Sequence, residues 1–173
     1  MNSYAHKEFT DNWACCHVYS LPYYFDEFLF VTIRFTGGMF DKVRRLVMSD
    51  IRPFVNRFFQ LISQSFPLLE SLLIINEKVK QNEEHSPTLI TFPHLLRLDL
   101  KGAHIDYARQ FLSDENTSLS RLIHLEIGYE TLSIVTEDFT NKATQHTCAQ
   151  IKSFVMGEPI VRSQKLSSDF SSL

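Results

Sequence analysis

The chain has 173 residues, with 17 Lys and Arg against 20 Asp and Glu, which gives a formal net charge of −3. This length is typical of one domain, and an apolar fraction of 44% is sufficient for a sizeable buried core. The slightly acidic balance argues against a general nucleic-acid binder, a class that is usually clearly basic.

Residues 1–17 read as an N-terminal extension, since no basic segment is followed by an apolar run and no secretory signal is predicted. The next stretch, "VYSLPYYFDEFLFVTIRF", is broken by one proline and three charged residues, so no membrane span is predicted. Cys15, Cys16 and Cys148 are too few, and odd in number, for a disulfide framework. We therefore expect an intracellular protein, cytoplasmic or nuclear, without a membrane partner.

The main feature of the sequence is a pattern, apolar-x-x-apolar-x-apolar, that recurs five times. The copies are "VRRLVM", "LESLLI", "LLRLDL", "LIHLEI" and "IKSFVM". Their central residues are Leu46, Leu72, Leu98, Leu125 and Phe154, so they follow one another at nearly equal intervals. A weaker copy, "VYSLPY", stands one similar interval upstream, from Val18 to Tyr23. Five copies in a nearly constant register indicate a repeat architecture.

In each copy the last two apolar residues are two positions apart, so they point to one face of a β-strand. One strand cannot bury that face alone, whereas stacked parallel strands share an apolar ladder. The residue three positions before each copy is also expected in the core; these are Phe40, Phe66, Phe92, Leu119 and Cys148. We predict an α/β fold over residues 18–156, a leucine-rich-repeat-like solenoid (horseshoe) with a parallel sheet of about five or six short strands.

Parallel strands need crossover segments, which are often helical. Apolar residues at helical spacing predict helices over 53–64, 104–114 and 131–139, and Pro53 suits a first helical position. Residues 77–88, "EKVKQNEEHSPT", are polar and charged, which predicts a solvated loop in place of a helix. A Phe-Pro pair is expected to end a crossover, because proline cannot continue a helix.

Four stretches resemble the leucine-rich-repeat region of F-box/LRR proteins, which carry substrates to cullin-type ubiquitin ligases. They are "YSLPYYFDEF", "GGMFDKVRRLVMSDIRPF", "ISQSFPLLESLLIIN" and "TLITFPHLLRLDLKGAHIDYARQFL". The resemblance covers residues 18–156. It implies an interaction scaffold with a Skp adaptor and a cullin as partners, and it carries over no catalytic residue.

The chain departs from that family in two ways. "LPYYFDEFLFVTIRF" begins with the Leu-Pro of an F-box helix but lacks the second half, so a strand and crossover before the first repeat is the favoured interpretation. The asparagine that usually follows each strand is also missing, and its positions hold Ile51, Glu77, Ala103 and Glu130. Asp50 and Asn76 lie one residue earlier, so we expect the turns to be stabilised in another way.

Strand residues between the ladder positions should face the concave surface, the usual ligand face of a solenoid. The predicted partner-binding residues are Arg45, Val47, Leu73, Ile75, Arg97, Asp99, Lys101, His124 and Glu126. Val47, Leu73 and Ile75 form an apolar row beside charges of both signs, which suits a protein or peptide ligand. In the alternative interpretation, the N-terminal segment or residues 77–91 cover this row, and Arg97, Asp99 and Glu126 form solvated pairs across strands.

Sequence patterns for catalysis are missing. "CCH" (Cys15 to His17) and "HTC" (His146 to Cys148) contain metal-ligand residue types, but adjacent cysteines fit one tetrahedral site poorly, and no C-x-x-C occurs. No dinucleotide-binding, P-loop, nucleophile-elbow or zinc-protease motif is present. We predict no enzyme activity, no catalytic or metal-binding residue and no cofactor.

The expected function is therefore a protein-binding module, the substrate-recognition part of an F-box-like ubiquitin-ligase receptor. A standalone scaffold or inhibitor without a ubiquitin role is the alternative, and a metal-dependent enzyme is a remote one. Residues 157–173 are Ser-rich and lack helical apolar spacing, which predicts a disordered tail.

Overall fold

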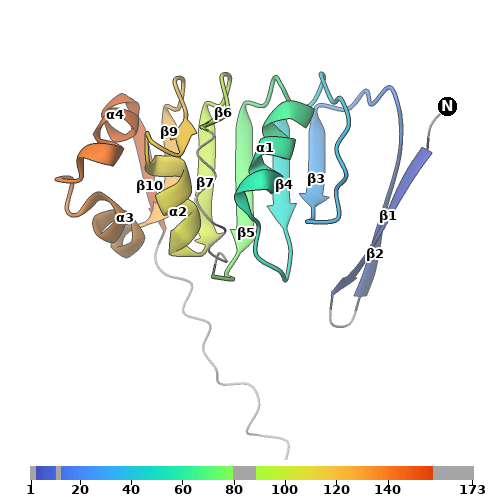
Figure 1. The fold of residues 1–173 in the computed structure, drawn as a ribbon, viewed down its shortest axis with the longest axis horizontal. Coiled ribbons are helices and arrows are strands. Elements are labelled where there is room, and N and C mark those ends of the chain that lie inside the picture. Colours follow the sequence, from blue (N-terminus) through green and yellow to red (C-terminus); the bar gives the residue numbers. More distant parts are fainter. Residues whose placement is uncertain (1–2, 11–12, 80–88, 158–173) are drawn as a thin grey trace, which may run out of the picture.

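The computed structural model describes residues 3–10, 13–79 and 89–157, and among these the side chains of 19–79 and 89–156. Within this part the fold is α/β, with a six-stranded sheet and four helices (Figure 1). The sheet strands are β3 (Glu27–Val31), β4 (Arg45–Ser49), β5 (Ser71–Asn76), β7 (Arg97–Ala103), β9 (His124–Gly128) and β10 (Ser153–Gly157). Neighbouring strands run parallel and follow one another across the sheet in chain order. The five repeat copies thus supply five adjacent strands.

The helices lie in the crossovers, in front of the sheet in the view of Figure 1. The α1 helix (Asn56–Ser65) connects β4 to β5, and α2 (Ile105–Leu112) lies between β7 and β9. Both lie where the apolar spacing predicts them, and α1 ends immediately before the Phe66-Pro67 pair.

The crossover from β9 to β10 contains two helices, α3 (Tyr129–Thr136) and α4 (Lys142–Gln150). The sequence predicts a helix at 131–139 but none at α4. The α4 segment, "KATQHTCAQ", has no apolar stripe, because its buried residues are Thr144 and Thr147. Both buried hydroxyl groups have hydrogen-bond partners: Thr144 donates to the Asn141 carbonyl, and Thr147 donates to the Asp114 carboxylate.

The strand before the first repeat lies later in the chain than the pattern "VYSLPY" predicts. Residues 13–20 belong to β2 (Trp13–Ser20), which pairs antiparallel with β1 (Ser3–Thr10) outside the main sheet. The first strand of the main sheet is β3, in which Glu27 pairs with Arg45. Pro22 explains part of the error, since proline has no N–H to donate to a strand ladder. A second small sheet pairs β6 (Ile90–Thr91) with β8 (Thr117–Ser118).

The backbone repeats as the sequence does. Before each of the last five strands of the main sheet, one carbonyl oxygen of the preceding repeat accepts two backbone N–H groups, at 2.6–3.1 Å. The accepting residues are Asp26, Arg44, Glu70, Leu96 and Ile123. A second bond recurs at the start of each strand copy, where the N–H of Val43, Leu69, Leu95, Leu122 or Ile151 donates to the carbonyl three positions back. Each copy therefore forms the same turn as well as the same strand.

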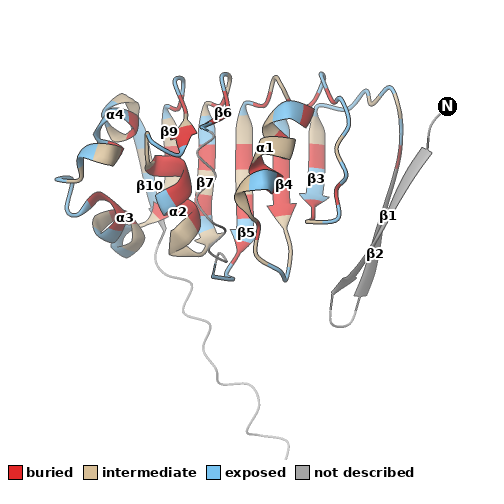
Figure 2. Cartoon of the chain, in the orientation of Figure 1, coloured by how far each residue is buried: buried red, intermediate tan, exposed pale blue. Residues whose placement is uncertain are grey.

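The core lies between the sheet and the helices, as the burial colouring shows (Figure 2). Leu46, Leu72, Leu98 and Leu125 share one ladder and are at most 1% exposed. The predicted pre-strand positions Phe40, Phe66, Phe92 and Leu119 are buried too. Cys148 is the exception, because it lies on α4 and is half-buried.

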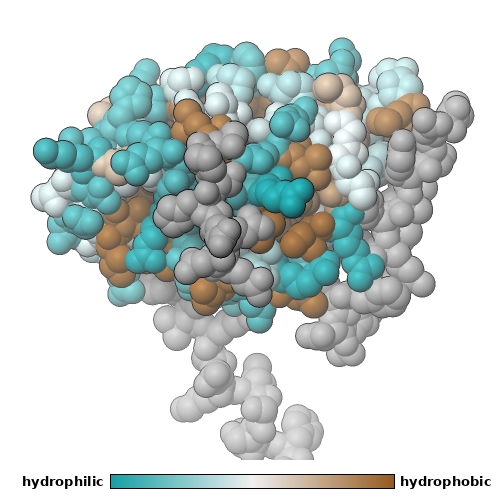
Figure 3. Space-filling view, in the orientation of Figure 1, coloured by the Kyte–Doolittle hydropathy of each residue, from teal (hydrophilic) through white to brown (hydrophobic). Residues whose placement is uncertain are grey.

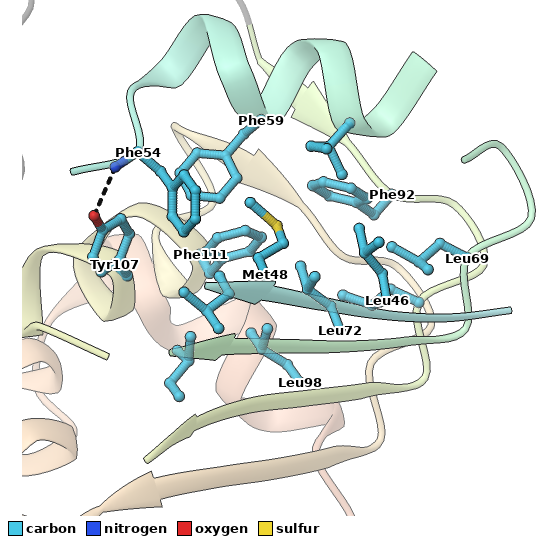
Figure 4. Close-up of a cluster of buried hydrophobic side chains, with 14 of the residues drawn as sticks. Leu46, Met48, Phe54, Phe59, Leu69, Leu72, Phe92, Leu98, Tyr107 and Phe111 are labelled. Atoms are coloured by element: carbon cyan, nitrogen blue, oxygen red, sulfur yellow. Dashed lines mark hydrogen bonds between the residues drawn. The ribbon is translucent and has the colours of Figure 1, made fainter. Parts of the chain in front are cut away.

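Tyr107 joins two crossovers inside this core. Its ring is fully buried, and its hydroxyl oxygen accepts the backbone N–H of Phe54 at 2.9 Å (Figure 4). The Phe54, Phe59 and Phe111 rings surround the same region between α1 and α2.

The turns after β4 and β5 use the two polar residues that precede the expected asparagine positions. Asp50 accepts the N–H groups of Ile33 and Arg52, at 2.8 and 2.9 Å. Asn76 donates to the Arg52 carbonyl at 2.7 Å and accepts the Lys78 N–H at 3.0 Å. These two side chains thus link successive turns, which is the other means of stabilisation that the sequence leads us to expect.

Two sequence predictions fall mainly outside the described residues: the solvated loop at 77–88 and the disordered tail at 157–173. Glu77, Lys78 and Val79 are described and exposed, and Gly157 ends β10. None of the helices in the described ranges has the length and apolar composition that a membrane span requires.

Candidate binding face of the sheet

One face of the sheet points away from the helices, and here it is called the open face. It consists of the strand residues that alternate with the buried ladder. In β4 to β10 these are Arg45, Val47, Ser49, Ser71, Leu73, Ile75, Arg97, Asp99, Lys101, His124, Glu126, Ser153 and Val155. Eight of the nine predicted binding residues lie on this face because side chains two positions apart in a strand share a face. Lys101 stands at a register shift of β7, and its contacts with Asp99 and Glu126 place it on the same face.

The apolar part of the open face is smaller than predicted. Ile75 is 40% exposed and Leu73 is half-buried, but Val47 is only 5% exposed. The prediction that Val47 is presented to a ligand is therefore wrong. The alternative interpretation predicts that this row is covered; Val47 is covered, but by β3 rather than by the N-terminal segment or residues 77–91.

The cause is a β-bulge in β3. Phe28 pairs with Leu46 and Val31 pairs with Met48, so Leu29 and Phe30 both lie opposite Val47. A bulge of this kind sets two residues against one. Phe30 adopts a left-handed backbone conformation there, with φ of 58°. Val47 is enclosed between this bulge and Leu73 of β5, and the apolar surface shifts to Leu29 and Phe30, which are 40% and 49% exposed.

Four of the predicted polar residues contact one another on β7 and β9. Lys101 Nζ lies 2.5 Å from Glu126 Oε2 and 3.8 Å from Asp99 Oδ2. His124 Nε2 lies 3.2 Å from Glu126 Oε1. We call these residues the charged cluster. The pairing across strands that the alternative interpretation predicts is thus present for Asp99 and Glu126, with Lys101 as the common cation.

Arg97 does not join the charged cluster. It is exposed and forms no ion pair with another residue of the described ranges. Arg45, at the other side of the sheet, forms an exposed ion pair with Glu27 at 2.9 Å. In the strand register both arginines pair with Ser71 of β5, the strand that carries Leu73 and Ile75.

Mutual hydrogen bonding sets the protonation of the charged cluster. The hydrogen bond from Lys101 lowers the pKa of the Glu126 carboxyl, and the contact with His124 lowers it further. The same bond to Glu126 raises the pKa of the Lys101 ammonium group. At neutral pH the pair is therefore charged on both sides.

The sequence did not single out Glu27, Leu29 and Phe30 as surface residues of the open-face region. Their strand, β3, precedes β4 by an interval (Glu27 to Arg45) much shorter than the one between repeat copies (Leu46 to Leu72), so the repeat pattern does not find it. The available signal was the apolar run "FLFV", but such a run does not show which of its side chains face the core.

A separate hollow of about 550 Å³ lies beside β3. Tyr19, Ser20 and residues 22–29 line it. Tyr24 and Phe25 are 77% and 70% exposed at its rim, while the Tyr23 hydroxyl donates to the Glu27 carbonyl at 2.9 Å. Burial raises the pKa of Tyr23. The Tyr23 ring packs on those of Phe25 and Phe28, so the wall of this hollow is also the N-terminal end of the core.

Metal-ligand residue types do not converge in the described part of the chain, where no group of three or more His, Cys, Asp or Glu could hold an ion. Cys148 is a free thiol on α4, and burial raises its pKa. The neighbouring His146 is exposed, and its backbone N–H donates to Asp114. The side chains of Cys15, Cys16 and His17 lie outside the described ones.

None of three comparisons with known proteins gives a match: no family model, no curated protein and no solved structure is significantly similar to this chain.

Proposed function

We propose that the chain is a leucine-rich-repeat-like solenoid that works as a protein-binding module. Three features support this arrangement: strands in chain order, helical crossovers on one side, and the same turn hydrogen bonds in every copy. A solenoid of this kind exposes an extended sheet face on which a partner can bind. No catalytic residue and no cofactor are part of the proposal.

The ligand site in this proposal is the open face. The observation that carries it is the position of exposed Ile75 and half-buried Leu73 beside the charged cluster, on a face without helices. An apolar centre with a charged border is the usual composition of a protein-binding surface. The helix-covered side is different, since its visible surface mixes hydrophilic and hydrophobic residues in the view of Figure 3.

The specific role that we propose is the recognition of a substrate for ubiquitin transfer, as in F-box/LRR receptors. The sequence resemblance over 18–156 supports it, together with the order of the strands. In this role a Skp adaptor and a cullin-type ligase would perform the transfer, in the cytoplasm or nucleus, while the solenoid selects the substrate.

One observation favours the alternative, a standalone scaffold or inhibitor without a ubiquitin role. Residues 3–10 and 13–20 form the β1–β2 pair, whereas the adaptor-binding part of an F-box is helical. The open face would bind a protein partner in both cases, and the two proposals differ only in whether an adaptor binds as well.

The test is quantitative affinity purification of the full chain and of Ile75→Asp from cells. Ile75 is the most exposed apolar residue on β5, so the variant places a charge on the open face without emptying the core. A matched control is Ile134→Asp on α3, where the isoleucine is 56% exposed on the helical side. Circular dichroism verifies that all three proteins fold.

We expect Ile75→Asp to lose one or more specific partners by at least about tenfold, while Ile134→Asp retains them. Recovery of the Skp adaptor and cullin with the wild-type chain would support the ligase role. Specific partners without an adaptor would favour the standalone scaffold. Equal recovery with Ile75→Asp and Ile134→Asp would refute the open face as the binding site.

A further inference from the structure

The last strand of the sheet leaves one of its two ladder positions, Met156, exposed, while the other, Phe154, is half-buried against the core. The second buried ladder residue of each inner strand, Met48, Ile74, Leu100 or Ile127, is at most 2% exposed. Met156 follows Ile127 in the same register, yet it is 51% exposed. Val155, on the open face of the same strand, is 40% exposed. Within the described ranges β10 pairs only with β9, so its outer edge presents unpaired backbone groups beside apolar side chains.

At the opposite end of the sheet the ladder positions are buried. Phe28 and Val31 continue the two ladders into β3, and they are only 4% and 2% exposed. Tyr19 and Tyr23 pack on Phe28, with ring centroids 5.4 and 5.2 Å away. The outer edge of β3 is also less suited than that of β10 to pairing with a second molecule, because β3 has a bulge between Phe28 and Val31 and carries the charged Glu27.

The β10 edge is suited to pairing with an identical edge. From Ser153 to Gly157 it carries no charged side chain, although natural edge strands usually carry charges that prevent such pairing. In an antiparallel pair centred on Val155, the midpoint of the strand, Phe154 of one copy lies opposite Met156 of the other. Phe154 and Met156 belong to the same face of the strand, so this pairing makes two sulfur–aromatic contacts.

We propose that the outer edge of β10 binds a second copy of this chain, in antiparallel register about a two-fold axis at Val155. The interface is isologous: each copy contributes the same strand, and the two sheets join into one. The pairing covers Met156 in both molecules and leaves the open face of each sheet available. This interaction is independent of the function proposed for the open face.

Disulfide trapping tests both the contact and its register. In a background in which Cys15, Cys16 and Cys148 are replaced by Ser, Val155→Cys is oxidised and the covalent dimer is measured on a non-reducing gel. The matched control is Ile75→Cys, because Ile75 is also apolar, on the open face and 40% exposed. Ser153→Cys is the register control, since Ser153 faces Gly157 rather than itself in the proposed pair.

We expect rapid dimer formation by Val155→Cys and at least about a tenfold slower rate for both controls, because only residue 155 lies opposite itself at cross-strand distance. Sedimentation of the unmodified chain should give twice the chain mass, and Met156→Lys should reduce this to the monomer. A monomeric wild-type chain, or Val155→Cys that reacts no faster than Ile75→Cys, overturns the proposal. Monomers with a protected residue 155 would overturn it as well, and would point to cover by another segment.

Discussion

At the β3 end of the sheet, Tyr19 and Tyr23 pack on Phe28 and Val31 is only 2% exposed, whereas at the β10 end Met156 is 51% exposed. Both ends continue the same two ladders of the same parallel sheet. Each inner strand is covered by its neighbours on either side, so the repeat itself is sufficient to bury it. A terminal strand lacks one neighbour, and its burial depends on residues outside the repeat.

The cover at the β3 end is aromatic. Phe40 lies at its centre, fully buried, with ring centroids 4.9–5.7 Å from those of Tyr19, Tyr23, Phe28, Phe35 and Phe66. Aromatic side chains bury large areas, and edge-to-face pairs stabilise them further. The contrast implies that side-chain truncations at the two ends differ widely in their effect on stability.

The largest effect is expected for Phe40→Ala. It should lower the free energy of unfolding by about 3–5 kcal/mol, because it empties a fully enclosed aromatic site. Met156→Ala, at the other end, should cost less than about 1 kcal/mol in dilute monomer, because half of its side chain is already in water. Urea unfolding measured on both variants gives the comparison, and equal losses would contradict the difference between the two ends.

An intermediate effect is expected in the turns, which are also asymmetric. Asp50 and Asn76 join successive turns in the N-terminal half, whereas the residue of β7 that pairs with Asn76 is Ala103, which has no polar side chain. Asn76 is 2% exposed, so Asn76→Ala leaves the Arg52 carbonyl and the Lys78 N–H without this partner.

We expect Asn76→Ala to lower the free energy of unfolding by about 1–3 kcal/mol. Asn116→Ala is the matched control, because Asn116 is exposed, and its change should stay within about 0.5 kcal/mol. Thermal unfolding of the two variants measures the difference. Similar melting temperatures would show that the Asn76 side chain contributes little to the turn.

The smallest effect concerns the Lys101–Glu126 pair on the open face. Both side chains are partly exposed, at 36% and 26%, so Glu126→Gln should cost less than about 1 kcal/mol at neutral pH. The pKa of Glu126 is lowered in the folded chain, so this contribution is present above the usual carboxyl range and is lost as the pH falls through the lowered pKa. The pKa of Lys101 is raised, so on the alkaline side the contribution is lost as the pH rises through that pKa.

A double-mutant cycle with Lys101→Met and Glu126→Gln, measured by urea unfolding at several pH values, isolates the pair. The coupling energy should be small at neutral pH and should approach zero in acid. A coupling energy that stays constant from neutral to acidic pH would exclude ionic pairing as its source.

Repetition made much of this fold predictable. The nearly constant spacing of Leu46, Leu72, Leu98 and Leu125 in the sequence predicts four strands with equivalent residues side by side. The structure pairs these four leucines in one ladder. Helices α1 and α2 followed from the apolar spacing between the strands. Eight of the nine predicted binding residues lie on one face for the same reason, since alternation decides which side chains point away from the core.

The sequence could not predict the burial or contacts of a residue whose neighbours lie outside its own repeat copy, and there the structure was required. Val47 has the same position in its strand as Leu73, yet it is buried because β3 has a bulge opposite it. In the charged cluster, Lys101 of β7 forms an ion pair with Glu126 of the neighbouring strand β9. Helix α4 has buried hydroxyls in place of an apolar stripe, so no periodicity could predict it.

The sequence by itself determined the stack of strands, because local periodicity sets which side chains face the core. Only the tertiary structure decided how the stack ends. An aromatic cap at β3 and an exposed edge at β10 arise from contacts between segments that the repeat does not relate, and no local pattern specifies such contacts.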